Sequence, residues 1–188
     1  SGLEKNIKNS YFRTFGKSAV EHLEDIQFLD ETVSLAHSVW LTERDVEMVA
    51  GLGPQICHNA SSNLKLQSGI APIQNLLSNG ATVALGTDSM SLNDDDDLFQ
   101  DMRLTAQLHR NTGIGETVPT AKQILTMATV NGAKATGFEG EIGRLSTGYR
   151  ADVVLLNLNR ISESPIKEST SPLEAIIYLA NKQDVDTV

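Results

Sequence analysis

The chain has 188 residues, of which 40% are hydrophobic and 21% are charged, a composition typical of a globular protein with a sizeable core. Its net charge is −9, from 15 Lys and Arg against 24 Asp and Glu, which argues against nucleic acid or anionic membranes as main partners. No apolar run reaches the roughly 18 residues that cross a bilayer. The single cysteine, Cys57, excludes an internal disulfide framework, and a cytoplasmic location is expected.

Helices and strands are expected to alternate along most of the chain. Capping-box pairs precede two of the helices, Ser18 with Glu21 and Thr120 with Gln123, and Gly80 fits the left-handed position after a third. The expected order is helix 19–29, strand 32–38, helix 43–52, strand 55–59, helix 71–80, strand 81–88, helix 96–110 and a helix from 120. This alternation predicts an α/β fold with a parallel sheet flanked by helices.

The amino-acid composition of the sequence changes near Gly137. The stretch "GFEGEIGRLSTGYRADVVLLNL" is rich in glycine and contains one apolar strand pattern. We therefore expect two units, residues 1–138 and residues 139–188, the second of them small and β-rich.

Three polar residues follow predicted strands in succession: His37, His58 and Asp88. In parallel α/β sheets, ligands bind beyond the carboxyl ends of the strands, so these side chains are expected at one rim. Two histidines and an aspartate there could hold a divalent metal or its activated water. Each residue alone is more often structural, and spacing by itself leaves the two interpretations evenly balanced.

The acidic run Asp94–Asp97 needs a separate explanation. Asp96 and Asp97 are expected to open a helix, where backbone N–H groups and the helix dipole favour negative charge. A calcium loop does not fit, because the run lacks the alternating acidic spacing and closing glutamate of such loops. The long stretch 61–72 is predicted to be a loop over the rim, either packed or able to offer Ser62, Asn63 or Lys65 to a ligand.

Four stretches together give the chain a family resemblance: "LAHSVWL" (35–41), "CHNASSNLKLQSGIAP" (57–72), "ALGTDSMSLNDDDDLFQDMRL" (84–104) and "IGRLSTGYRADVVLLN" (142–157). In this order they resemble the amidohydrolase superfamily, in particular its branch of cytosine deaminases, atrazine chlorohydrolases and adenosylhomocysteine deaminases. The resemblance implies a (β/α)8 barrel with a small β-sandwich built from both chain ends. It also implies one catalytic divalent metal, zinc or iron, and a small N-heterocyclic substrate.

The resemblance assigns roles to individual residues. His37 matches the strand-six histidine that orients the attacking hydroxide. Asp88 matches the strand-eight aspartate that ligates the metal and accepts the proton of the water. Glu4 matches the strand-five glutamate that shuttles a proton to the substrate. The residues expected near the substrate are Trp40, His58, Ser62 and Asn63.

Other family features have no match in this sequence. The H-x-H pair of strand one is absent, and Ser1 stands where strand five supplies a histidine ligand. We therefore expect the C-terminal part of a barrel, from about strand five or six onward, with part of the sandwich. Such a fragment is expected to be inactive by itself, to bind metal weakly or not at all, and to self-associate, whereas a full-length parent would hydrolyse a carbon–nitrogen bond. The alternative is a non-catalytic α/β module that assembles with a second chain.

Overall fold

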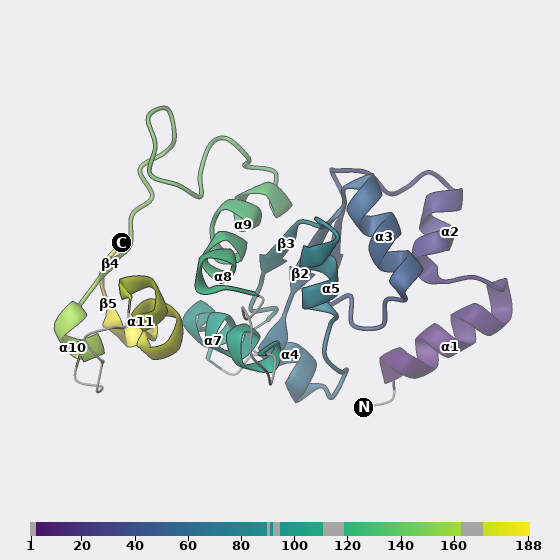
Figure 1. Ribbon diagram of the computed structural model, residues 1–188, viewed down its shortest axis with the longest axis horizontal. Helices are drawn as coiled ribbons and strands as arrows, with labels where there is room; N and C mark the ends of the chain where they lie inside the picture. The colour runs from purple at the N-terminus through teal and green to yellow at the C-terminus, as the bar shows by residue number, and fades with distance from the viewer. Residues whose placement is uncertain (1–2, 90, 92–94, 111–118, 163–170) are drawn as a thin grey trace.

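The computed structural model describes residues 3–89, 91, 95–110, 119–162 and 171–188 (Figure 1). The elements up to residue 135 are α1 (Leu3–Phe15), α2 (Ala19–Asp25), β1 (Ser34–Ala36), α3 (Glu43–Leu52), β2 (Gln55–His58), α4 (Ala60–Lys65), α5 (Ile73–Ser78), β3 (Val83–Leu85), α7 (Leu98–Leu108), α8 (Ala121–Ala128) and α9 (Val130–Ala135). The later elements are β4 (Leu155–Leu156), α10 (Leu158–Ser162), α11 (Pro172–Leu179), the 3-10 helix η1 (Lys182–Asp184) and β5 (Val185–Thr187).

The centre of the molecule is a parallel sheet in the order β1-β2-β3. Leu35, Ile56 and Val83 lie side by side in register across the three strands. Each strand is followed by a helical connection, α3 after β1 and α4 with α5 after β2. The predicted α/β class and the parallel sheet are therefore confirmed.

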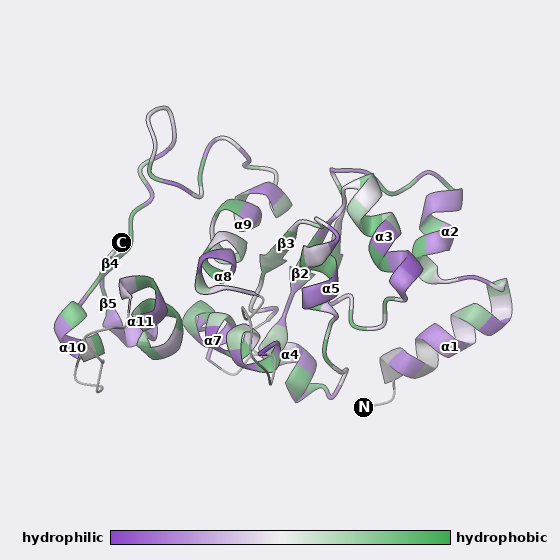
Figure 2. Ribbon diagram, viewed as in Figure 1, coloured by the Kyte–Doolittle hydropathy of each residue, from purple (hydrophilic) through white to green (hydrophobic). Residues whose placement is uncertain are grey.

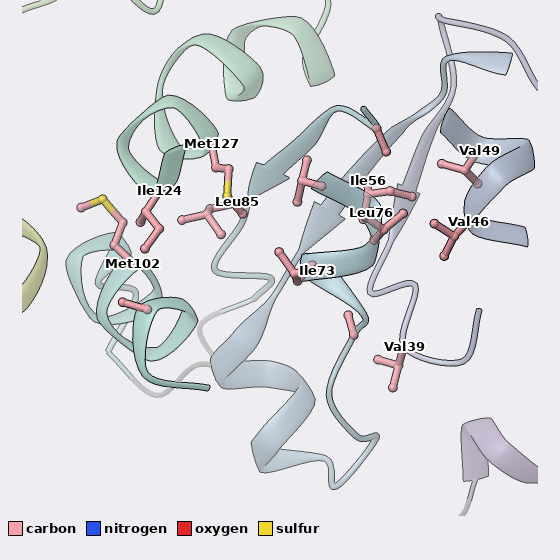
Figure 3. Packing of buried hydrophobic residues seen from close by; sticks show 14 of the residues in the cluster. Val39, Val46, Val49, Ile56, Ile73, Leu76, Leu85, Met102, Ile124 and Met127 are labelled. Atoms are coloured by element: carbon pink, nitrogen blue, oxygen red, sulfur yellow. The ribbon is translucent and has the colours of Figure 1, made fainter. Parts of the chain in front are cut away.

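The core lies between this sheet and the helices that cover it. Figure 3 shows Ile56 and Leu76 close together near Val46 and Val49 of α3, whereas Leu85 points toward Ile124 and Met127 of α8. These side chains are almost completely buried, and burying each one stabilises the fold by roughly 1.5–3 kcal/mol. The helices carry apolar and polar residues on different faces, visible as alternating green and purple in Figure 2.

Local signals set the ends of several helices as expected. The N-cap side chains of Ser18, Thr42 and Thr120 each accept from the backbone N–H three residues on, and all three capping boxes form. The helix expected over 43–52 is observed as α3 with the same bounds. Gly80, with φ of +83°, takes the left-handed position after α5.

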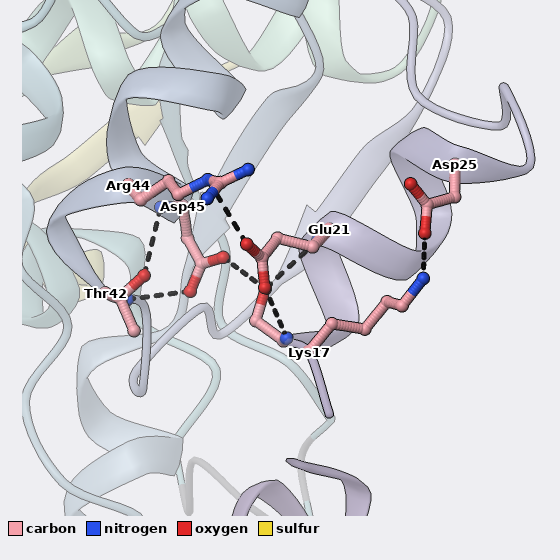
Figure 4. Close-up of polar contacts among 7 residues, drawn as sticks. Lys17, Glu21, Asp25, Thr42, Arg44 and Asp45 are labelled. Atoms are coloured by element: carbon pink, nitrogen blue, oxygen red, sulfur yellow. Dashed lines mark hydrogen bonds and ion pairs between the residues drawn. The ribbon is translucent and has the colours of Figure 1, made fainter. Parts of the chain in front are cut away.

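One buried carboxylate joins α2 to α3 (Figure 4). Asp45 is 2% exposed and closes the capping box of α3, accepting the Thr42 N–H at 2.8 Å. Its other oxygen accepts the hydroxyl of Ser18, the N-cap of α2. Arg44 and Glu21 add an ion pair at 3.2 Å between the same two helices. The buried charge is thus satisfied by hydrogen bonds, the condition for burying it without a large penalty.

Several elements differ from the sequence predictions. The helix expected over 96–110 runs from Leu98 to Leu108, since Asp97 rather than Asp96 is its N-cap. Residues 61–65, expected within a loop, belong to α4. Helices α1 and α11 were not anticipated. Asp94 lies outside the described residues.

Residues 139–162 and 171–188 hold less β-structure than expected. The antiparallel pair β4-β5 is accompanied by α10 and α11. α11 packs on α7 and α8, and this C-terminal region lies at the opposite end of the molecule from α1 and α2 (Figure 1). Within the described ranges, no helix combines the length and apolar character needed to cross a membrane.

Replacing Asp45 by alanine should lower the free energy of unfolding by about 1–3 kcal/mol, because it removes a helix cap and leaves the Thr42 N–H and the Ser18 hydroxyl without their acceptor. Urea unfolding followed by circular dichroism measures the change. Glu47→Ala, an exposed position on the same helix, is the matched control and should change stability by only about 0.5 kcal/mol or less. Equal losses in both variants would contradict the assigned role of Asp45.

Candidate functional site

His37 and Asp88 meet at the carboxyl edge of the parallel sheet. His37 directly follows β1 and Asp88 lies shortly after β3. Parallel pairing brings these strand ends to the same edge, and the His37 Nε2 and Asp88 Oδ2 atoms are 3.8 Å apart. The side chains are 30% and 24% exposed, so a small molecule can reach them. At this distance they form an ion pair only while the imidazole is protonated.

Both residues have left-handed backbone conformations, with φ of +63° at His37 and +63° at Asp88. For a non-glycine residue such a conformation costs of the order of 1 kcal/mol or more, and it is found preferentially at functional sites. The backbone turns away from the strand direction at both positions. Gln27, Ser38, Gln67 and Asp96 also have positive φ, so the conformation supports this location only together with the approach of the two side chains.

Helix α4 contacts both side chains through consecutive residues. The Ser62 hydroxyl donates to Asp88 Oδ2 at 2.7 Å. Asn63 Oδ1 lies 2.9 Å from His37 Nδ1. Ser62 is fully buried and Asn63 is 2% exposed. Both residues were predicted to lie near the substrate, and both bond the two residues at the sheet edge.

Asn59 and Gly86 fill the space beneath this pair. Asn59 Nδ2 lies 3.4 Å from His37 Nδ1, and its Oδ1 accepts the Cys57 thiol at 3.4 Å. A Cβ at Gly86 would lie 2.6 Å from Asn59 Oδ1 and 2.8 Å from Cys57 Sγ, so glycine is required there. Burial, with Asp88 and Asp101 nearby, raises the pKa of the Cys57 thiol. Cys57 is therefore a neutral packing residue and a poor nucleophile.

His58 lies beneath the rim, not on it. It is 1% exposed and its ring packs against His109, with centroids 5.4 Å apart. The cause is the alternation along β2: His58 is in register with Leu85 and shares its buried environment. Burial lowers the pKa of His58 to about 3, aided by His109 and His37, and burial lowers that of His109 to about 4. Both rings are therefore neutral at pH 7.

A cavity of about 380 Å³ adjoins His37 on the side of α1. Trp40 is one of its walls, and its indole N–H donates to the Ser68 carbonyl at 3.0 Å. A Cβ at Gly69, where φ is +122°, would lie 2.8 Å from Val39 Cγ1 and 3.4 Å from the Trp40 ring. The hydrogen bond to Ser68 thus orients the tryptophan beside His37.

Glu4 and Lys65 were also predicted to be near the site. Glu4 lies in the first turn of the helix α1. Ser1, the position that matches a histidine ligand, is outside the described residues. Lys65 donates to the Ser91 carbonyl at 3.1 Å.

The side chains of His37 and Asp88 are of the types that bind a divalent metal, but two ligands are too few. Carboxylate oxygen and imidazole nitrogen are both zinc ligands, and a catalytic zinc usually has three protein ligands. Within the part of the chain that the structure describes, no group of three or more His, Cys, Asp or Glu side chains could hold a metal. His37 and Asp88 by themselves therefore do not complete a zinc site.

Comparison with known proteins identifies the family. The model of the amidohydrolase family matches residues 2–188. The chain belongs to this family. It is 41% identical over 173 residues to a 5-methylthioadenosine/S-adenosylhomocysteine deaminase of Thermococcus onnurineus, covering 92% of this chain and 40% of the relative. It is likewise 41% identical to a 5'-deoxyadenosine deaminase of Methanosarcina barkeri, covering 92% of this chain and 39% of that protein.

Solved structures of this family have the same fold. An adenosine deaminase from Xanthomonas campestris with bound zinc superposes with a TM-score of 0.87 at 29% identity, covering 95% of this chain and 40% of that one. The zinc complex of atrazine chlorohydrolase from Arthrobacter aurescens gives 0.83 at 26% identity, covering 95% and 39%. The predicted superfamily is therefore confirmed. The amidohydrolase chain spans about 40% of the length of the relatives that it matches.

The buried histidine pair should make the protein sensitive to acid. Because the folded-state pKa values of His58 and His109 lie below the ordinary value of 6.5, their neutral forms stabilise the fold fully above about pH 6.5. That stability is lost as the pH falls toward 4 and then 3, at up to about 1.4 kcal/mol per pH unit for each histidine. His58→Leu should therefore flatten the decline of unfolding free energy between about pH 6 and pH 4, measured by urea titration.

His22→Leu is the matched control, since His22 lies in α2 outside the buried pair. It should keep the wild-type dependence on pH. An unchanged slope in His58→Leu, or an equally flattened slope in the control, would contradict the assignment.

Proposed function

We propose that this chain carries part of an active site that, in a full-length protein, hydrolytically deaminates an adenine nucleoside. The observation that carries this proposal is the approach of His37 Nε2 to Asp88 Oδ2, 3.8 Å apart at the carboxyl edge of a parallel sheet. The names of the relatives from Thermococcus and Methanosarcina support the substrate class, because both are deaminases of adenosine derivatives. In such a reaction water adds at C6 of adenine, the C6–N bond breaks and ammonia leaves.

The two residues at the sheet edge take complementary roles. Asp88 accepts the proton of the attacking water, and the Ser62 hydroxyl keeps its carboxylate oriented for this. His37 presents Nε2 toward the same space and orients the water. Glu4 is assigned the transfer of a proton to the ring nitrogen, and Trp40 forms a wall beside the bound substrate. His58 supports the site from below, packed against His109.

A divalent metal, when bound, would supply Lewis-acid activation of the water. Asp88 would contribute one of its oxygen ligands, in keeping with the zinc named for the Xanthomonas and Arthrobacter structures. The described residues do not supply the others. We assign those ligands to the part of a full-length protein that lies outside this chain.

The proposal also covers the domain organisation of the chain. We assign residues 1–138 to the C-terminal part of a (β/α)8 barrel and residues 139–188 to part of a small β-sandwich domain. The parallel order β1-β2-β3 and the 40% coverage of relatives with this fold support the assignment. The free thiol of Cys57 agrees with a reducing cytoplasm as the location.

A second candidate is a non-catalytic module that assembles with another chain. The small number of metal-ligand side chains among the described residues favours it, because His37 and Asp88 are fewer than the ligands that zinc catalysis requires. In that case the sheet edge would be a structural contact, and activity would not appear even with the missing part supplied.

Activity can be tested by joining this chain to the part of the Thermococcus onnurineus relative that it does not cover. We expect the zinc-loaded chimera to release ammonia from 5'-methylthioadenosine, 5'-deoxyadenosine or adenosine. Asp88→Ala should lower kcat by about 10³-fold or more, because one change removes a ligand and a general base. Ammonia release is measured with a coupled assay, and zinc content by atomic absorption.

Asp97→Ala is the control within the same acidic stretch. Asp97 caps α7, accepting the Phe99 N–H at 2.9 Å, and it also accepts the Lys182 N–H at 3.0 Å, so its loss should cost about 1–3 kcal/mol of stability and leave turnover nearly intact. A folded chimera that does not turn over any of the three substrates would refute the proposal. Equal loss of turnover in Asp88→Ala and Asp97→Ala would refute the division of roles.

The isolated chain should self-associate. On the described residues, β1 and β3 each pair on one side only, and unpaired strand edges template pairing with another chain. Exposed apolar side chains lie at both ends of the molecule, among them Phe12, Phe15, Val154 and Leu158. Sedimentation velocity should show dimers or larger species whose fraction rises with concentration. A monomer at all concentrations would contradict this expectation.

A further inference from the structure

Helix α4 is capped by a residue from another helix. Its own N-cap residue, Asn59, makes no side-chain capping bond, because the Asn59 side chain contacts Cys57 and His37 instead. The cap is provided by Asp101 of α7, whose Oδ1 accepts the Ser61 N–H at 3.0 Å. The Ser61 hydroxyl lies 3.0 Å and 3.1 Å from the two oxygens of the same carboxylate. Asp101 is completely buried.

The residues that follow Ser61 are the ones that contact the pair at the sheet edge. Ser62 bonds Asp88, and Asn63 bonds His37. Ser61, Ser62 and Asn63 all belong to α4, a helix of six residues, so fixing its first turn fixes the placement of all three. A six-residue helix has little stability of its own and depends on its tertiary contacts.

Asn63 also favours one neutral tautomer of His37. Asn63 Oδ1, an acceptor, lies 2.9 Å from His37 Nδ1, an arrangement that favours the tautomer with its proton on Nδ1. Asn59 Nδ2, a competing donor, is more distant at 3.4 Å. With the proton on Nδ1, the lone pair of neutral His37 is on Nε2, the atom that faces Asp88.

We propose that Asp101 is a positioning residue: by capping α4 it holds Ser62 on Asp88 and Asn63 on His37, and so fixes the tautomer and orientation of the pair. Because His37 and Asp88 are the catalytic pair of the proposed function, this inference deepens that function and rests on it for its consequence. The arrangement itself is measurable without turnover, so the two can fail separately.

The test uses the chain labelled with ¹⁵N-histidine, with long-range ¹H–¹⁵N spectra recorded at about pH 8.5, where imidazole is neutral. The His37 signals are assigned with His37→Gln. We expect the wild type to show the Nδ1–H tautomer. In Asp101→Leu, the ratio of the Nδ1–H to the Nε2–H tautomer should fall about fivefold or more, the size expected when one neutral hydrogen bond is lost. Asp101→Asn keeps an accepting oxygen for the Ser61 N–H and should restore most of the wild-type ratio.

Asp184→Asn is the matched control, a buried carboxylate that caps η1 and bonds Asn181 instead of α4. It should lower stability without changing the His37 spectrum. If Asp101→Leu does not fold, Ser61→Ala takes its place, and its tautomer ratio should still fall below that of the wild type.

Four results would overturn the proposal: an Nε2–H tautomer in the wild type, an unchanged ratio in folded Asp101→Leu, an unchanged ratio in the substitute Ser61→Ala, or an equal change in Asp184→Asn. If the chimera is active and any of these four results is found, the proposed function stands and the role of Asp101 is refuted. If the chimera is inactive and the spectra are as expected, the role of Asp101 in positioning stands and the proposed function is refuted.

Discussion

Parallel pairing of β1, β2 and β3 is the constraint on which the site depends. It places all three carboxyl ends at one edge, so residues 51 positions apart in the sequence, His37 and Asp88, come within 3.8 Å. Antiparallel pairing of β2 with β3 would send Asp88 to the far edge of the sheet. The helices contribute by burying Ile56, Val83 and Leu76 at the centre of the cluster, which holds the strands in this register.

The left-handed turns at His37 and Asp88 are an unfavourable feature that the surroundings must offset. Their cost is of the order of a few kcal/mol together. Continued pairing past the ends of the strands offsets part of it, since His37 N–H donates to the Cys57 carbonyl at 2.9 Å and Gly86 N–H to the His58 carbonyl at 3.1 Å. The bonds from Ser62 and Asn63 add further support. A strained pair held from several directions is preorganised, which is what proton transfer requires.

The sequence allowed correct predictions of the features that depend on neighbouring residues along the chain. The capping box of Thr42 and Asp45 and the left-handed Gly53 lie at the two ends of α3, so both bounds of that helix were correct. Strand positions were correct because β-branched and apolar runs have few alternatives. The approach of His37 to Asp88 was also foreseeable, since it requires only that the strands be parallel.

Features that depend on distant partners were not predictable. α4 was expected to be a loop because its cap, Asp101, lies 40 residues further along the chain. Nothing local in the sequence shows that the side chains of Ser62 and Asn63 bond Asp88 and His37. His58 follows the same strand-end pattern as His37, yet the alternation along β2 turns it into the core. Residues 1–4 were matched to a strand-end motif, so the helix α1 was missed.

The aspartates between residues 88 and 97 have different roles because their side chains point to different partners. Asp88 faces the site, Asp96 accepts the Thr87 hydroxyl at 2.7 Å, and Asp97 caps α7 while accepting the Lys182 N–H at 3.0 Å. α7 therefore contacts the C-terminal region at its first turn and α4 through Asp101 one turn later. At its other end, His109 packs under His58. One helix thus links the C-terminal region, helix α4 and the buried histidine pair.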